Sequence, residues 1–222
     1  AAWVGFQVAY PIARPALEHP PLYDELLHVV AAEGILATGE PRMADGQYRR
    51  AEPYTRLVAA AYRINGVSLD SARLPALIAA MLLVGVVGAW VTRRAGAIAG
   101  AAAALSLPLS GQTIELAAFA RFYTLHALLV FVMCIAVFEA IQPARRLSLR
   151  GLAVLVALLL LPLAWQLQET TAIAVGALGL GAASTLFVYH QDEVTAAYHR
   201  RPLAWTAAAL ALLVIGLLLT WK

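Results

Sequence analysis

Apolar residues form long runs from about residue 71 to the end of the chain, whereas polar residues and prolines prevail from residue 14 to residue 70. Runs of about 20 apolar residues are the length that an α-helix needs to cross a bilayer. We expect complete or nearly complete spans over residues 73–91, 95–109, 122–141, 152–165, 172–189 and 203–221. Residues 1–13 are interpreted as the end of a first membrane helix. The pattern predicts an all-α, polytopic transmembrane helix bundle of about six to seven spans.

The polar region from 14 to 70 contains two amphipathic stretches, at 23–36 and 54–64. In the first, the helical period places four apolar side chains on one side: Leu26, Leu27, Val30 and Ile35. Gly39 and Pro41 are typical helix-ending residues. The pattern therefore predicts amphipathic interfacial helices inside the first large loop, lying along the membrane surface.

Composition agrees with this organisation and excludes several classes of function. The chain is 62% hydrophobic and 13% charged, whereas a soluble domain is about 25% charged. The net charge of +3 and the one cysteine argue against nucleic-acid binding and rule out a disulfide within the chain. We therefore treat residues 1–222 as a single membrane domain, divided into 1–13, an outer-face loop at 14–70 and a bundle at 71–222.

The arginines give this bundle an orientation. Arginine clusters at 93–94, 145–150 and 200–201 follow alternate spans, and the segments between them, around residues 110–120 and 166–169, hold no basic residue before Arg121. Basic loops stay in the cytoplasm. The loop at 14–70 is therefore expected on the outer face.

The candidate chemistry centres on two neighbouring carboxylates in that loop, Asp24 and Glu25. His28 follows at helical spacing, so the three side chains could share one face and act as a general base with its support. The same set could hold a divalent cation, although this spacing is a weak metal signal. Carboxylates also stabilise a helix N-terminus, and that plainer interpretation stays open.

An ordered set of motifs surrounds this pair: Asp24-Glu25, Thr38-Gly39, Ala72-Arg73-Leu74-Pro75 and Ala120-Arg121-Phe122-Tyr123-Thr124-Leu125. With the outer-face loop, this set resembles the GT-C glycosyltransferases, and more narrowly the bacterial protein-mannosyltransferase and aminoarabinose-transferase type. The resemblance covers roughly residues 15–140. It implies a multi-pass protein of the bacterial inner membrane that transfers a sugar from a polyprenyl-phosphate donor to an acceptor on the outer (periplasmic) face.

The resemblance also implies roles for individual residues. Asp24 would be the catalytic base, supported by Glu25 and His28. A lipid phosphate is best met by arginine, and the candidates are Arg121, Arg49 and Arg50, with Arg56 in the same loop. Arg121 could equally be an arginine that reaches from its span to the interface.

Three further residues near the head of the 122–141 span are candidates for substrate contact. His126 stands where relatives often carry an aspartate, and a histidine inside a span needs a cavity or a partner. Glu115 could be a second acid, but we favour an ion pair between Glu115 and Arg121. Tyr123 is as consistent with anchoring at the interface as with contact to a sugar.

A second hypothesis is non-catalytic. Relatives of the GT-C type have more spans and usually a soluble domain, so the chain could be a fragment, a minimal module or a membrane subunit that packs within a larger complex. A transporter is a weaker alternative, because no span is visibly broken or charged at its middle. The sugar and the acceptor are not specified by the sequence.

Overall fold

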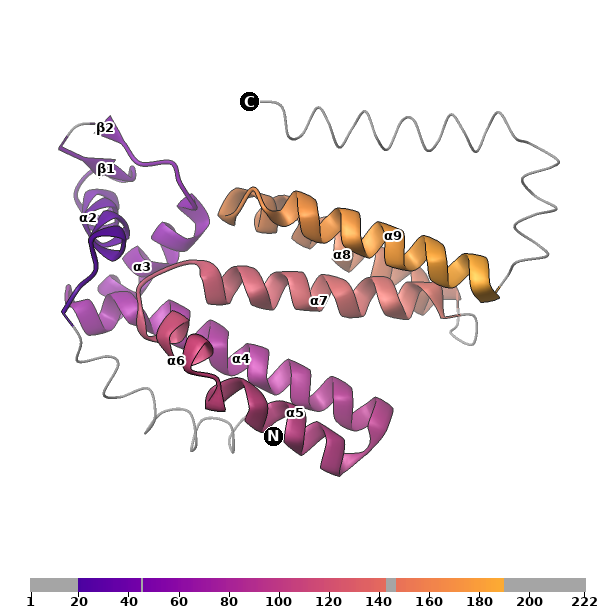
Figure 1. Ribbon diagram of the computed structural model, residues 1–222. Helices are drawn as coiled ribbons and strands as arrows, with labels where there is room; N and C mark the ends of the chain where they lie inside the picture. The colour runs from indigo at the N-terminus through magenta and orange to yellow at the C-terminus, as the bar shows by residue number, and fades with distance from the viewer. Residues whose placement is uncertain (1–19, 45, 143–146, 190–222) are drawn as a thin grey trace, which may run out of the picture. The chain divides into compact units, whose positions relative to one another are not determined.

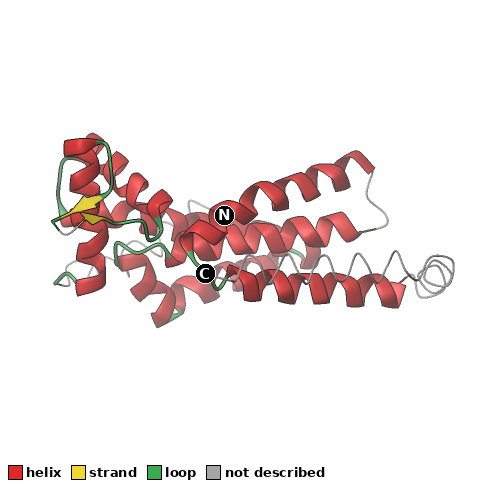
Figure 2. Ribbon diagram, turned by 90° about the horizontal axis from the view of Figure 1, so that it is seen from above, coloured by secondary structure: helices red, strands yellow, loops and turns green. Residues whose placement is uncertain are grey.

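The computed structural model describes residues 20–189, apart from residue 45 and residues 143–146. The expected first-helix end at 1–13 and the span at 203–221 lie outside the described residues. The loop region forms α2 (Tyr23–Thr38), β1 (Arg42–Met43), β2 (Gly46–Gln47) and α3 (Glu52–Asn65). The apolar helices are α4 (Leu69–Ala95), α5 (Ala97–Leu109), α6 (Gly111–Ala118), α7 (Tyr123–Ile141), α8 (Leu147–Leu167) and α9 (Thr171–Tyr189). Figure 2 shows how helix dominates this part of the chain.

Within the described residues, three helices are long and apolar enough to cross a membrane: α4, α7 and Ser148–Leu167 in α8. A fourth crossing results if the bent pair α5 and α6 is one broken span, and the apolar part of α9, Thr171–Thr185, is shorter. The described part therefore confirms an apolar helical protein with three candidate spans, or four if the bent pair is counted as one. Six to seven spans stay a prediction.

The segment from 110 to 120, expected as an outer loop, is mostly helix α6. It continues α5 after a break at Ser110, whose backbone is extended, and the two helices meet at 62°. Pro108 lies near the end of α5, and the helix restarts because Ala117 and Ala118 bury themselves as α6 packs against α4. Local polarity around Gln112 and Thr113 concealed this short helix.

Helix α2 forms where it was expected, but its buried face is different. Ile35 is buried as expected, whereas Leu26 and Val30 are exposed and Leu27 is half-buried. The buried residues are Glu25, His28, Ala31, Ala32 and Ile35. The prediction from hydrophobicity chose the wrong face, because Glu25 and His28 are buried beside polar partners inside the protein.

The strands β1 and β2 form a small antiparallel hairpin that pairs Arg42 with Gln47 and Met43 with Gly46. The hairpin packs on α2, and a side chain at Gly34 would collide with the backbone of Arg42. Glycine at position 34 therefore permits the close approach that holds the loop region together.

Small residues serve packing between α4 and α5. A Cβ on Gly88 would meet Ala104 Cβ at 2.9 Å, and one on Gly100 would collide with Thr92. By contrast, a Cβ on Gly176, Gly179 or Gly181 in α9 would meet nothing within 4 Å among the described residues. The close-packing interpretation of small residues therefore holds for the first helix pair.

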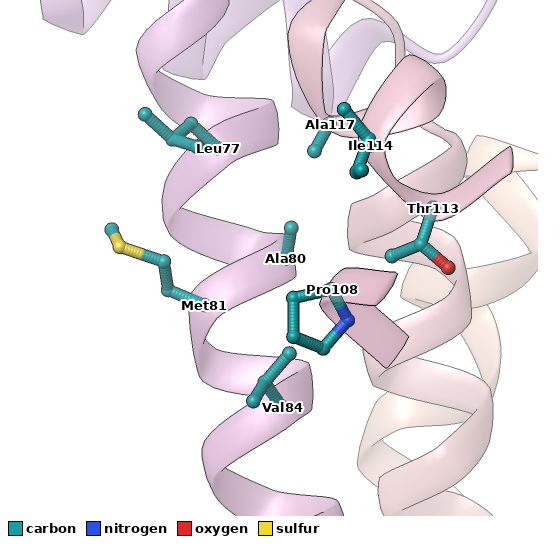
Figure 3. A pocket seen from close by; sticks show the side chains of 8 residues that line it. All are labelled: Leu77, Ala80, Met81, Val84, Pro108, Thr113, Ile114 and Ala117. Carbon is teal, nitrogen blue, oxygen red and sulfur yellow. The ribbon is translucent and has the colours of Figure 1, made fainter. Parts of the chain in front are cut away.

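An apolar pocket lies between α4 and the α5–α6 pair, as Figure 3 shows. Its lining comprises Leu77, Ala80, Met81 and Val84 of α4, Pro108 of α5, and Thr113, Ile114 and Ala117 of α6. No charged side chain lines it. The polar chemistry is instead gathered where α2, α3 and the beginning of α4 meet the segment before α7.

The chain divides into two compact units, and all the site candidates belong to the first, which comprises residues 1–132 and 166–168. The described part of the second unit consists of the end of α7, most of α8, and α9. There Arg150 Nε donates to the Ala140 carbonyl at 2.7 Å, and Thr171 Oγ1 donates to the Ala164 carbonyl at 2.9 Å. These bonds join successive helices of that unit.

Candidate active site

A buried ion pair joins the first turn of α2 to the beginning of α4. Arg73 Nε donates to Glu25 Oε1 at 2.8 Å, and Arg73 Nη2 donates to Glu25 Oε2 at 3.0 Å. Both side chains are 0% exposed. Such a side-on, two-bond arrangement is the strongest geometry available to an arginine and a carboxylate.

The same carboxylate also fixes the segment that precedes α7. The backbone N–H of Ala120 donates to Glu25 Oε1 at 2.7 Å, and the N–H of Leu22 makes a longer bond of 3.4 Å to Oε2. Both oxygens of Glu25 are therefore engaged away from solvent. This placement favours a positioning role for Glu25, in addition to its effect on the start of α2.

Asp24, the neighbouring residue, faces a different environment. Its Oδ2 lies 2.8 Å from Arg121 Nη2, and its side chain is 49% exposed while that of Arg121 is 18% exposed. The expected pair between Glu115 and Arg121 is wrong: Arg121 pairs with Asp24, and Glu115 is exposed on α6. The reason is that Glu25 holds Ala120 against α2, which brings Arg121 to the adjacent carboxylate.

The guanidinium of Arg121 is also held by Tyr123. Arg121 Nη2 donates to the Tyr123 hydroxyl at 2.8 Å, and the guanidinium carbon lies 4.5 Å from the centre of the tyrosine ring. Arg121 Nε is buried and has no hydrogen-bond partner among the described residues. One edge of this cation is therefore only partly used.

His28 is enclosed by three aromatic rings and a threonine hydroxyl. Its Nδ1 is 2.9 Å from Thr55 Oγ1, and its ring meets the rings of Tyr48, Tyr54 and Phe122 edge to face at centroid distances of 5.3, 5.2 and 5.7 Å. The histidine is 1% exposed. These contacts come from α3, the loop before it and the segment before α7, so His28 joins three parts of the site.

Burial lowers the pKa of His28 to about 4, with Arg121 and then Arg50 contributing in the same direction and Asp24 opposing them. His28 is therefore neutral at physiological pH, and its imidazole can take part in hydrogen bonds without adding charge. Burial also raises the pKa of Tyr54 well above 10, with the negative charge of Glu25 as the next cause.

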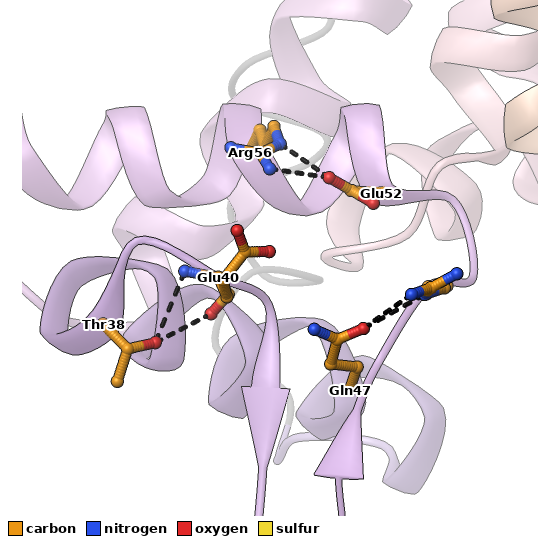
Figure 4. A network of polar contacts seen from close by, with 6 residues as sticks. Thr38, Glu40, Gln47, Glu52 and Arg56 are labelled. Atoms are coloured by element: carbon orange, nitrogen blue, oxygen red, sulfur yellow. Dashed lines mark hydrogen bonds and ion pairs between the residues drawn. The ribbon is translucent and has the colours of Figure 1, made fainter.

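The loop arginines differ in their surroundings. Arg49 donates to Gln47 Oε1 through Nη2 at 2.8 Å, and Arg56 pairs with Glu52 at 2.7 Å in the exposed network of Figure 4. Arg50 instead lies 5.7 Å from the centre of the Phe122 ring. Arg50 therefore contacts Phe122, one of the rings around His28, whereas the described contacts of Arg49 and Arg56 are with Gln47 and Glu52.

The three side chains that could have shared a divalent cation, Asp24, Glu25 and His28, do not converge. Within the described ranges, no group of three or more His, Cys, Asp and Glu side chains is arranged to hold a metal ion. Glu25 is bound to Arg73 and His28 to Thr55, while Asp24 faces outward to Arg121. His126, which was a candidate for substrate contact, is half-buried one turn into α7. Its backbone N–H donates to the Phe122 carbonyl at 2.8 Å.

Two site residues were missed by sequence reasoning. Arg73 was noted only as part of a motif, although a basic residue at the head of an apolar span signals a need for a buried acidic partner. Thr55 gives no such signal, because its role depends on the contact with His28. The backbone N–H of Ala120 is equally invisible to any pattern of side chains.

The chain matches no protein-family profile and no curated protein. Its fold is similar to the crystal structure of ArnT from Cupriavidus metallidurans in the apo state, with a TM-score of 0.69 and 19% sequence identity. The match covers 98% of this chain and 40% of that one, so the chain spans less than half of the length of ArnT. At this identity the likeness concerns the fold alone, and it shows that the chain shares the fold of part of ArnT.

Proposed function

We propose that the chain is a membrane glycosyltransferase module of the GT-C type, which transfers a sugar from a polyprenyl-phosphate donor to an acceptor at the outer face of the bacterial inner membrane. One observation carries the proposal: an accessible carboxylate, Asp24, lies beside a mostly buried arginine, Arg121, on a rigid support made by Glu25 and Arg73. The GT-C-like fold supports the same function.

In this proposal Asp24 is the general base. Its carboxylate takes the proton of an acceptor hydroxyl while the hydroxyl oxygen forms a bond to the anomeric carbon. The bond between that carbon and the phosphate oxygen breaks, and its electron pair leaves on the lipid phosphate. Arg121, with Arg50 nearby, balances the phosphate charge, and Glu25 and His28 keep the two reacting groups in place.

The environment of the site suits a lipid-linked donor. The site lies at the head of α4 and just before α7, two of the helices that are long enough to cross a membrane. Helix α2 exposes Tyr23, Leu26 and Val30, and Leu22 just before it is also exposed, as an interfacial helix would require. The basic residues at the other end of α4, Arg93 and Arg94, support an outer-face position for the site.

The test is turnover of a polyprenyl-phosphate sugar by the purified chain in lipid nanodiscs. Asp24→Asn should lower the rate by about 10²- to 10⁴-fold, the usual contribution of a general base. Glu33→Gln is the matched control, because it removes one exposed carboxylate from the same helix, and it should keep the wild-type rate. A fully active Asp24→Asn protein would exclude this mechanism.

The alternative is a non-catalytic membrane subunit, and one observation favours it. Among the described residues, only 6% of the apolar window of α8 is buried, so this helix offers surface for lipid or for partner chains. A subunit would co-purify with those partners, and its function in the complex would tolerate Asp24→Asn.

A further inference from the structure

Arg73 and Arg121 differ in how the Nε and Nη2 atoms of their guanidinium groups are hydrogen-bonded. The Nε and Nη2 atoms of Arg73 each donate to a separate oxygen of Glu25. In Arg121, Nη2 serves both Asp24 and Tyr123, while Nε is buried without a hydrogen-bond partner among the described residues. An unpaired, buried N–H on a cation is costly, so an oxyanion that takes the place of Asp24 and reaches Nε would satisfy this donor.

We propose that Arg121 is a latch shared by Asp24 and the donor phosphate: a phosphate that occupies Nε and Nη2 displaces the Asp24 carboxylate and thereby frees it to act as the base. This inference rests on the proposed function and adds its regulation. Before the donor binds, Asp24 is engaged by Arg121; after binding, its carboxylate is available to an acceptor hydroxyl. The donor therefore binds before the acceptor is activated.

The geometry favours this exchange over a movement of the whole site. The guanidinium stays in place because the Tyr123 ring and hydroxyl hold it. The Asp24 side chain is 49% exposed, so it can turn toward solvent without disturbing packing. A phosphate can accept two parallel hydrogen bonds from Nε and Nη2 of Arg121, whereas Asp24 meets Nη2 alone. Glu25 cannot turn in the same way, because it is enclosed.

The exchange makes Asp24 a competitor of the phosphate, and binding measurements can detect this. The full chain in nanodiscs is titrated with farnesyl phosphate, with farnesol and inorganic phosphate as parallel probes. Asp24→Asn should bind farnesyl phosphate about 1.5- to fivefold more tightly than wild type, because the competing ion pair is lost. Arg121→Gln should bind it at least about tenfold more weakly. Glu33→Gln should leave the affinity unchanged.

The double variant Asp24→Asn with Arg121→Gln separates the latch from simple repulsion. If Asp24 acts through Arg121, the double variant binds like Arg121→Gln alone. A tightening that persists without Arg121 would mean that Asp24 only repels the phosphate, and it would overturn the latch. Thermal unfolding of each variant shows that the binding change is not a folding defect.

The remaining outcomes of the titration distinguish failure of the latch from failure of the proposed function. If wild type binds through Arg121 but Asp24→Asn binds equally or more weakly, the latch fails and the proposed function stands. If wild type shows no binding that depends on Arg121, the proposed donor site fails and the latch fails with it. Equal tightening for farnesol would also overturn it, since farnesol carries no phosphate that could compete with Asp24 for Arg121.

Discussion

Asp24 and Glu25 are adjacent in one helical turn, yet their ion pairs belong to different regions of the molecule. Successive helical residues point about 100° apart, so Glu25 faces the interior and Asp24 faces the surface. Glu25 is enclosed, bonded twice to Arg73 and once to the Ala120 backbone. Asp24 has a single contact with Arg121 and is half exposed. Glu25 is placed to hold the fold, and Asp24 is the carboxylate that reacts in the proposed function.

The comparison predicts opposite consequences for two similar substitutions. Removing one partner of a buried pair leaves an uncompensated charge inside the protein, whereas an exposed pair contributes little to folding. Stability and activity should therefore separate: substitution of Glu25 affects folding first, and substitution of Asp24 affects turnover with little effect on folding.

The largest effect on stability is expected for Glu25→Gln. It should lower the free energy of unfolding by about 3–5 kcal/mol, because it breaks the enclosed ion pair between Glu25 and Arg73. Thermal or denaturant unfolding in detergent measures this. Arg73→Gln should cost a similar amount, and the double variant should cost clearly less than the sum of the two. Additive losses would show that the pair is not coupled.

A pH-dependent effect of intermediate size is expected from His28. The unfolded chain protonates this histidine near pH 6.5, whereas burial lowers its pKa to about 4 in the folded protein. Between these values the unfolded state binds more protons, so stability is full above pH 6.5 and falls as the pH drops toward 4, by about 3 kcal/mol in all.

The control for that titration is His28→Gln, which cannot gain a proton in this range. Unfolding curves of both proteins across pH 4 to 7 share the contributions of the carboxylates, so their difference isolates His28. A difference that stays constant with pH would contradict the assignment of a neutral, buried histidine.

The smallest effect on stability is expected for Asp24→Asn, at about 0.2–1 kcal/mol, because the pair with Arg121 is partly in solvent. High salt should reduce even this amount. The same unfolding assay used for Glu25→Gln measures it, with Glu33→Gln as the reference. A loss as large as that of Glu25→Gln would remove the distinction between the two pairs.

Local patterns predicted much of the architecture. The helices at 23–38 and 52–65 and the long apolar helices follow from periodicity and run length, which act over a few residues. Asp24 and Glu25 could also be picked out as candidates, because acidic residues stand out in a chain this apolar. The small helix α6 was missed, since its eight residues are too few for a clear pattern.

The different environments of Asp24 and Glu25 could not be predicted from local patterns. Glu25 meets Arg73 across 48 residues of sequence and Ala120 across 95, and neither distance leaves a periodic signal. The expected Glu115–Arg121 pair followed proximity in sequence, but tertiary packing brought Asp24 to Arg121 instead.

By itself the sequence determined the helices, their apolar character and the acidic pair at the start of α2, because hydrophobic burial and helix periodicity act locally. Only the tertiary structure decided which face of α2 is buried, which carboxylate is enclosed and which arginine each one meets. The physical reason is that a buried charge is tolerated only beside its partner, and that partner is identified by the fold rather than by any neighbouring residue.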